Sequence, residues 1–155
     1  MNTKMRTPKH TRPVMSPLLR ALAFSRTTHE PVTQAMLLQC YTALDAFDRG
    51  HGSRELFTTL GRHLLVSVEL SHLGFEREAL EDIESAHAAM VEVDAAAHQD
   101  GWLLDDEAYV SLCVALAILD RQLQAASLEA IARAEARMIE GLMRVDRRAI
   151  ADATV

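Results

Sequence analysis

The sequence predicts an all-α protein, a single antiparallel helical bundle of four long helices with a short N-terminal helix, preceded by a flexible basic arm. Composition favours helix, because Ala, Leu and Met are plentiful whereas aromatic residues make up 5% of the chain. Apolar residues also recur at helical spacing between glycines and capping residues. We expect residues 1–15 to be the arm, 16–148 one helical domain and 149–155 a frayed tail.

The arm is distinguished by its charge. The first 26 residues contain no acidic side chain, whereas the whole chain has 22 Asp and Glu against 16 Lys and Arg. Pro8, Pro13 and the lack of an apolar period predict flexibility up to residue 15. A mobile cationic segment can contact a protein partner or nucleic-acid phosphate. We expect such contacts from four side chains: Lys4, Arg6, Lys9 and Arg12.

The first two helices begin at prolines. Ser16 and Pro17 are a good capping residue and first helical residue, so they predict a short helix through about residue 24. A long helix is expected over residues 31–48, and Gly50 follows its end. This long helix has one apolar stripe, formed by Met36, Cys40, Ala43, Leu44 and Phe47.

The next two helices are predicted to form a hairpin. Ser53 caps a helix that runs to Leu73, and Gly74 supplies the left-handed residue that ends it. Its apolar stripe comprises Leu56, Phe57, Leu60, Leu64 and Val68. Another helix is expected from near Phe75 to about residue 99, before Gly101. Because the connections are short, sequential helices are expected to be antiparallel neighbours.

The last two helices follow further capping residues. Asp105 caps a helix over residues 106–125, whose apolar positions spread round most of its surface, so we expect it to be the central helix. Ser127 caps the last helix, which extends to about residue 148. Five of its apolar side chains are expected to point inward: Leu128, Ile131, Met138, Ile139 and Leu142.

Polar side chains inside the apolar stripes are candidates for a site. His63 borders one stripe, and the hairpin is expected to bring it near His87, with Asp94 and His98 further along the same face. Two interpretations stay open, a hydrogen-bonded network and a mononuclear zinc or acid–base site. The network is favoured, because no cysteine contributes and no ligand spacing is diagnostic. We therefore expect neither a metal nor another cofactor.

A second metal-binding pattern, Glu-x-x-His, occurs at Glu69–His72 and Glu84–His87. Two such pairs and two further Glu residues hold the metals of four-helix carboxylate proteins. Hairpin geometry offsets the two pairs by about 12 Å, at about 1.5 Å of rise per residue. They are not expected to share a dinuclear site.

The sequence contains no motif of a catalytic site. Gly50-His51-Gly52 is a turn between helices and not a phosphate-binding loop, and no serine lies in a nucleophile elbow. Cys40 and Cys113 lie in separate apolar segments, as expected of buried thiols in a reducing cytoplasm. No apolar run is long enough to cross a bilayer. We expect a cytoplasmic protein that is not an enzyme and does not bind membranes.

Three segments carry a resemblance that covers most of the chain. They are Arg12-Pro13-Val14 in the basic arm, the turn over residues 49–53, and the Ala/Leu/Ile-rich segment over residues 115–123. This layout resembles a group of small helical proteins of proteobacterial prophages and mobile elements, some of which are labelled Fis-type regulators. The resemblance implies a phage or mobile-element context and no assigned active site. The chain lacks the basic C-terminal helix-turn-helix that the regulator label requires.

Three hypotheses for function follow. The first is a non-enzymatic interaction protein that binds a host or phage protein, such as a host defence complex, and that can also form homo-oligomers. An acidic body can imitate nucleic acid toward a basic protein surface. The second is a DNA-associated regulator that uses the basic arm together with Arg144, Arg147 and Arg148. The third is a metal-binding helical protein that uses the His/Asp cluster.

Overall fold

The computed structural model describes residues 30–152, without the side chains of residues 98–100 and 150–152. The predicted basic arm over residues 1–15 and the predicted short helix over residues 17–24 lie outside the described residues, as does the end of the predicted frayed tail. The described chain forms long helices joined by short connections: α2 (Glu30–Asp48), α3 (Arg54–His72), the 3₁₀ turn η1 (Arg77–Ala79), α4 (Leu80–Asp100), α5 (Asp106–Ala125) and α6 (Leu128–Asp152).

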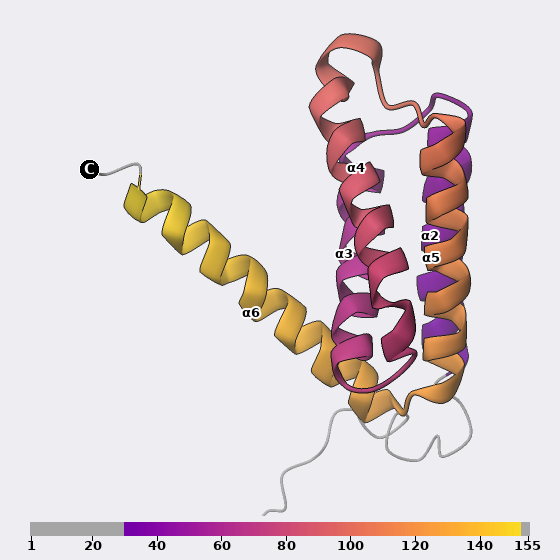
Figure 1. Ribbon diagram of the computed structural model, residues 1–155, viewed down its shortest axis with the longest axis vertical. Coiled ribbons are helices and arrows are strands. Elements are labelled where there is room, and N and C mark those ends of the chain that lie inside the picture. Colours follow the sequence, from indigo (N-terminus) through magenta and orange to yellow (C-terminus); the bar gives the residue numbers. More distant parts are fainter. Residues whose placement is uncertain (1–29, 153–155) are drawn as a thin grey trace, which may run out of the picture.

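The helices α2 to α5 run up and down as an antiparallel bundle, in which α5 returns to pack against α2 (Figure 1). The all-α class and the bundle are therefore confirmed, although the described residues contain five long helices and not four. The last predicted helix, α6, begins beneath the bundle and then departs from it at a steep angle (Figure 1). It packs chiefly against α3.

Side-chain caps fix where the helices begin. A side-chain oxygen accepts a hydrogen bond from a backbone N–H near the start of α3, α5 and α6, which satisfies a donor that has no partner within the helix. The three capping residues, with their donors and distances, are Ser53 (Leu56 N, 3.3 Å), Asp105 (Ala108 N, 2.7 Å) and Ser127 (Ala130 N, 3.2 Å). These are the capping residues that the sequence predicts.

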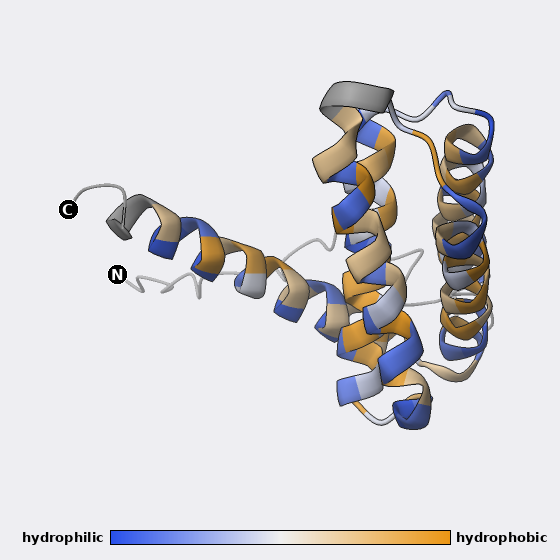
Figure 2. Ribbon diagram, turned by 45° about the horizontal axis from the view of Figure 1, so that its top comes forward, coloured by the Kyte–Doolittle hydropathy of each residue, from blue (hydrophilic) through white to orange (hydrophobic). Residues whose placement is uncertain are grey.

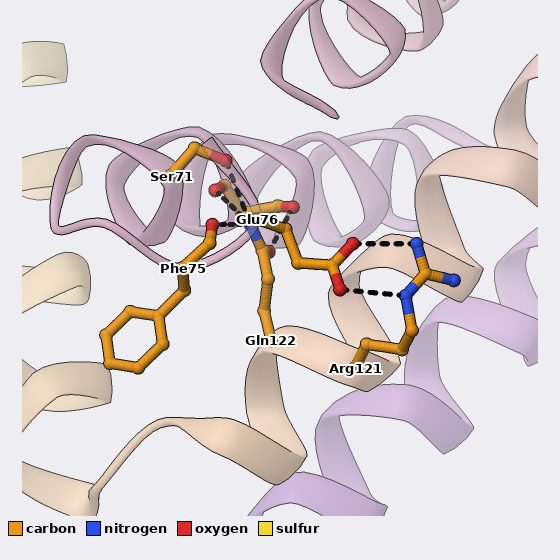
Figure 3. A network of polar contacts seen from close by, with 6 residues as sticks. Ser71, Phe75, Glu76, Arg121 and Gln122 are labelled. Carbon is orange, nitrogen blue, oxygen red and sulfur yellow. Dashed lines mark hydrogen bonds and ion pairs between the residues drawn. The ribbon is translucent and has the colours of Figure 1, made fainter. Parts of the chain in front are cut away.

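The connection from α3 to α4 is longer than predicted. Gly74, at φ +105°, ends α3 as expected, and Phe75 N donates to Leu70 O over 3.0 Å to close the turn. Glu76 then takes a left-handed conformation, with φ 51°, so the helix expected from Phe75 begins instead at Leu80. A bidentate ion pair with Arg121 of α5 holds Glu76 there, at distances of 3.0 and 2.8 Å (Figure 3). This tertiary contact leaves no local sequence pattern.

The central helix is α3 and not α5. It packs against α2, α4, α5 and α6, whereas α5 packs against α2, α3 and α4. The prediction for α5 was wrong because Val110 and Val114, which spread its apolar surface round the helix, are 60% and 43% exposed. Four leucines of α5 do face the core and are at most 1% exposed: Leu112, Leu116, Leu119 and Leu123.

The prediction for α6 was partly wrong. Ile131 and Met138 are buried as expected, but Ile139 is 46% exposed and Leu142 is 41% exposed. Every side chain from Ile139 to residue 149 is exposed. The reason is the path of α6, because a helix that diverges from α3 carries its stripe away from the surface that buried it.

Candidate protein-binding surface

The apolar stripe of α6 continues beyond the bundle. Its buried part comprises Ile131, Ala134 and Met138, at most 5% exposed. Leu142 and Val145, both exposed, continue it at the same helical spacing, and the exposed Ile139 and Met143 widen the apolar surface on one side. We call these four side chains the distal stripe. Apolar residues recur along α6 almost to its free end, between polar ones (Figure 2). A stripe of this kind is the surface a helix uses to pack against another element.

An open groove lies where α6 diverges from the bundle. It has a volume of about 890 Å³ and is bounded by α2, α3 and α6. Its apolar lining includes Val32 and Leu38 of α2, Leu56 of α3 and Met138 of α6. Leu38 is 68% exposed, more than any other large apolar side chain in the described residues. The groove therefore ends at Met138, the residue after which the α6 stripe becomes exposed.

Charged side chains edge the groove. Glu55 and Arg62 of α3 and Glu135 of α6 lie along it, as does His63. His63 Nε2 lies within hydrogen-bond distance, 3.0 Å, of the Gln39 Oε1 on α2. Burial, helped by the positive charge of Arg62, lowers the pKa of His63, so the neutral ring is favoured. His63 thus joins α2 to α3 as a polar wall of the groove.

The described members of the predicted His/Asp cluster, His63, His87 and Asp94, are not grouped as a metal site. His63 is engaged with Gln39 on α2. Asp94 pairs with Arg54, whose Nη1 lies 2.9 Å from Asp94 Oδ1 without the alignment of a hydrogen bond. His87 is half-buried on α4, and the side chain of His98 is outside the described residues.

A metal site needs several His, Cys, Asp or Glu side chains close together in the part of the chain that the structure describes. There, no three or more His, Cys, Asp or Glu side chains are grouped so that they could hold a metal ion. Glu69 Oε2 and His72 Nδ1 lie 3.7 Å apart at the end of α3, while Glu84 is exposed on α4. The two Glu-x-x-His pairs do not form a joint site among these residues.

Sequence reasoning missed a buried polar network around Gln122. This residue of α5 is fully buried, and its side-chain Nε2 donates toward Ser67 O, Ser71 Oγ and Phe75 O over 2.9 to 3.1 Å (Figure 3). Ser67 Oγ donates to Gln122 Oε1 over 2.6 Å. The available signal was a glutamine between Leu119 and Leu123, on the apolar face of its helix. The network joins α5 to the end of α3 and to the turn that follows it.

The arm residues that the sequence singled out, Lys4, Arg6, Lys9 and Arg12, lie outside the described residues. Among the helices that are described, none combines the length and apolar character that crossing a membrane requires. Comparisons with protein-family models, curated proteins and solved structures found no match.

Proposed function

We propose that this chain is a non-enzymatic helical interaction protein, which binds another polypeptide through the distal stripe of α6 and the adjacent groove. The observation that supports the proposal is the exposed stripe. Leu142 and Val145 are 41% and 64% exposed on a helix whose first half packs through the same face, and Met143 beside them is 56% exposed. Covering apolar surface stabilises a complex by about 25 cal/mol per Å² before the costs of association.

The chemistry of this surface suits a polypeptide ligand. Amphipathic helices bind in apolar grooves through side chains at helical spacing, and this chain has both a helix and a groove of that kind. A nucleic-acid interface is instead strongly cationic and polar, because most of its contacts are to phosphate. The groove carries Glu55 and Glu135, which would repel phosphate.

The mobile-element context that the sequence resemblance implies suggests a class of partner. In that context the partner is a host or phage protein, such as a component of a host defence complex. The acidic balance of the chain, 22 Asp and Glu against 16 Lys and Arg, suits a basic partner surface.

The test is affinity capture with matched variants. The wild-type chain, Leu142→Glu/Val145→Glu and Val91→Glu are each used as bait. Val91 is 52% exposed on α4, away from the groove, so it controls for an added surface charge. Polypeptides that bind the wild type and Val91→Glu, and that are lost with the double variant, are the expected result. Equal capture by all three baits would contradict the proposal.

A DNA-associated function remains a second proposal. It is favoured by the exposure of Arg144, Arg147 and Arg148 near the end of α6, which could act with the basic arm. If it is correct, the protein is retained on duplex DNA at low salt and released steeply as salt rises. Absence of retention at low salt would remove this second function.

A further inference from the structure

The distal stripe and the groove lie on the same chain, so each copy carries both an exposed apolar helix and an apolar groove. We infer that the groove is filled by the α6 helix of a second copy, and that two chains exchange these helices about a two-fold axis. This inference rests on the proposed function, because it names the polypeptide that covers the surface. It follows from the continuity of the stripe, the area available and the distribution of charge.

The surface that buries the first half of α6 continues into the groove. The buried part of the stripe, Ile131 to Met138, packs against α3 of its own chain. The groove is bounded by that same α3, by α2 and by Met138. A second α6 seated in the groove therefore meets the kind of surface that the first α6 meets in its buried half. It also lies beside the first α6 at Met138, so the two distal stripes begin at a common point.

The area favours reciprocal exchange over binding of one helix. Residues 139–152 span about 21 Å and the helix is about 10 Å across, so one seated helix covers roughly a few hundred Å² on each side. Stable interfaces bury about 800 Å² on each partner. Exchange places a helix and a groove from each chain in the interface, and the contact between the two α6 helices adds to it. A two-fold axis also closes the assembly, whereas one-way binding would continue into open chains.

Charge agrees with this arrangement. Next to Leu142 and Val145, residues 144–148 carry Arg144, Arg147 and Arg148 against Asp146, although Glu140 and Asp152 make residues 139–152 neutral in total. The groove carries more acid than base, with Glu55 and Glu135 opposed by Arg62. The basic segment over residues 144–148 can thus lie against the acidic groove, and complementary charge orients the association.

Sedimentation of the full chain over a range of concentrations tests the inference. The expected mass is twice the chain mass of 17.2 kDa. Leu142→Glu changes the helix and Leu38→Glu changes the groove, at side chains that are 41% and 68% exposed within one chain. Each variant is expected to stay helical by circular dichroism and to raise the dimer dissociation constant by roughly 100-fold, because the charge would be buried twice. The control Val91→Glu is expected to stay dimeric.

Mixing the two variants separates exchange from other contacts. In each pure variant, both helix-in-groove contacts carry one defect. In a mixed dimer both defects fall in one contact, and the other contact is wild type on both sides. Leu142→Glu and Leu38→Glu together are therefore expected to form a dimer more tightly than either does alone. If the mixture dimerises no more tightly than each variant does alone, the proposed exchange of helices is overturned.

Other results of the sedimentation and capture experiments distinguish the inference from the proposed function. A wild-type monomer at all concentrations overturns the second-copy inference, while the proposed function stands if partner capture is still lost with Leu142→Glu/Val145→Glu. If neither self-association nor partner capture depends on Leu142 and Val145, the second-copy inference and the proposed function are both wrong. A monomer that dimerises only after removal of residues 1–29 would assign the groove to the chain's own N-terminal segment, which also overturns the inference. A dimer that persists unchanged in the Leu142→Glu variant and in the Leu38→Glu variant also overturns the inference.

Discussion

Ser67 Oγ donates a hydrogen bond of 2.6 Å to Gln122 Oε1, between two fully buried residues that are 55 positions apart in the chain. The Gln122 amide also faces acceptors on Ser71 and Phe75, so one side chain joins α5 to α3 and to the turn that follows α3. Buried amides and hydroxyls are costly unless paired, so this contact specifies how α5 sits on α3.

Replacing Gln122 is expected to destabilise the fold. Gln122→Ala leaves the hydroxyls of Ser67 and Ser71 without their partner and opens a cavity, which together cost about 2–4 kcal/mol. Gln124→Ala is the control, because that side chain is exposed and pairs only with Asp120 of its own helix among the described hydrogen bonds. Chemical denaturation would show the difference. Equal midpoints for the two variants would mean that the network contributes little.

Glycines at two positions are expected to respond oppositely to alanine. A Cβ at Gly52 would overlap the Phe47 ring and the Trp102 side chain, which pack together beside the turn, so Gly52→Ala should destabilise by about 1–3 kcal/mol. Gly61 lies inside α3 with no atom near an added Cβ, so Gly61→Ala should stabilise by about 0.5–1 kcal/mol. Thermal melts of both variants check the two signs.

Truncating Leu116 is expected to be among the costly core changes. The side chain is fully buried in the middle of α5, and Leu116→Ala should cost about 2–5 kcal/mol. Val114→Ala, two residues away and 43% exposed in the wild type, should change stability by less than about 1 kcal/mol. A melting temperature unaffected by Leu116→Ala would show that this part of α5 does not pack as described.

The Glu76–Arg121 pair predicts a pH dependence. The hydrogen bond from Arg121 holds the pKa of Glu76 below its usual 4.5. A carboxyl whose pKa is lower in the folded state stabilises the fold above pH 4.5, and this contribution is lost as the pH falls through the lowered pKa. Arg121→Gln should therefore be less stable than the wild type at pH 7, with a gap that narrows below pH 4.5. A gap independent of pH would mean that the pair is not the cause.

Cys40 is expected to resist thiol reagents in the folded protein. Burial raises its pKa to about 12, so almost no thiolate forms at pH 8. Cys113 is only partly buried and should react first. Mass spectrometry after brief alkylation is expected to place the label on Cys113, and label on Cys40 should appear only after denaturant is added. Early modification of Cys40 would contradict its burial.

The sequence by itself determined the helices of the described chain. Ser53, Asp105 and Ser127 cap helices through local contacts, and Gly74 ends a helix locally. Each of these positions could therefore be predicted from its neighbours in the chain. The apolar stripe of α2 could also be predicted, because helical spacing alone decides which side chains share a face. Met36, Cys40 and Phe47 are buried as that spacing predicts.

Only the tertiary structure decided what those faces meet. The spacing that buries Met138 also predicts burial of Leu142, yet α6 diverges from α3 between them, and periodicity carries no information about where a partner surface ends. The late start of α4 likewise depends on Arg121, 45 residues from Glu76. The groove arises from the angle between α6 and its neighbours. These features depend on contacts between residues far apart in the chain, so a pattern read along the sequence could not reveal them.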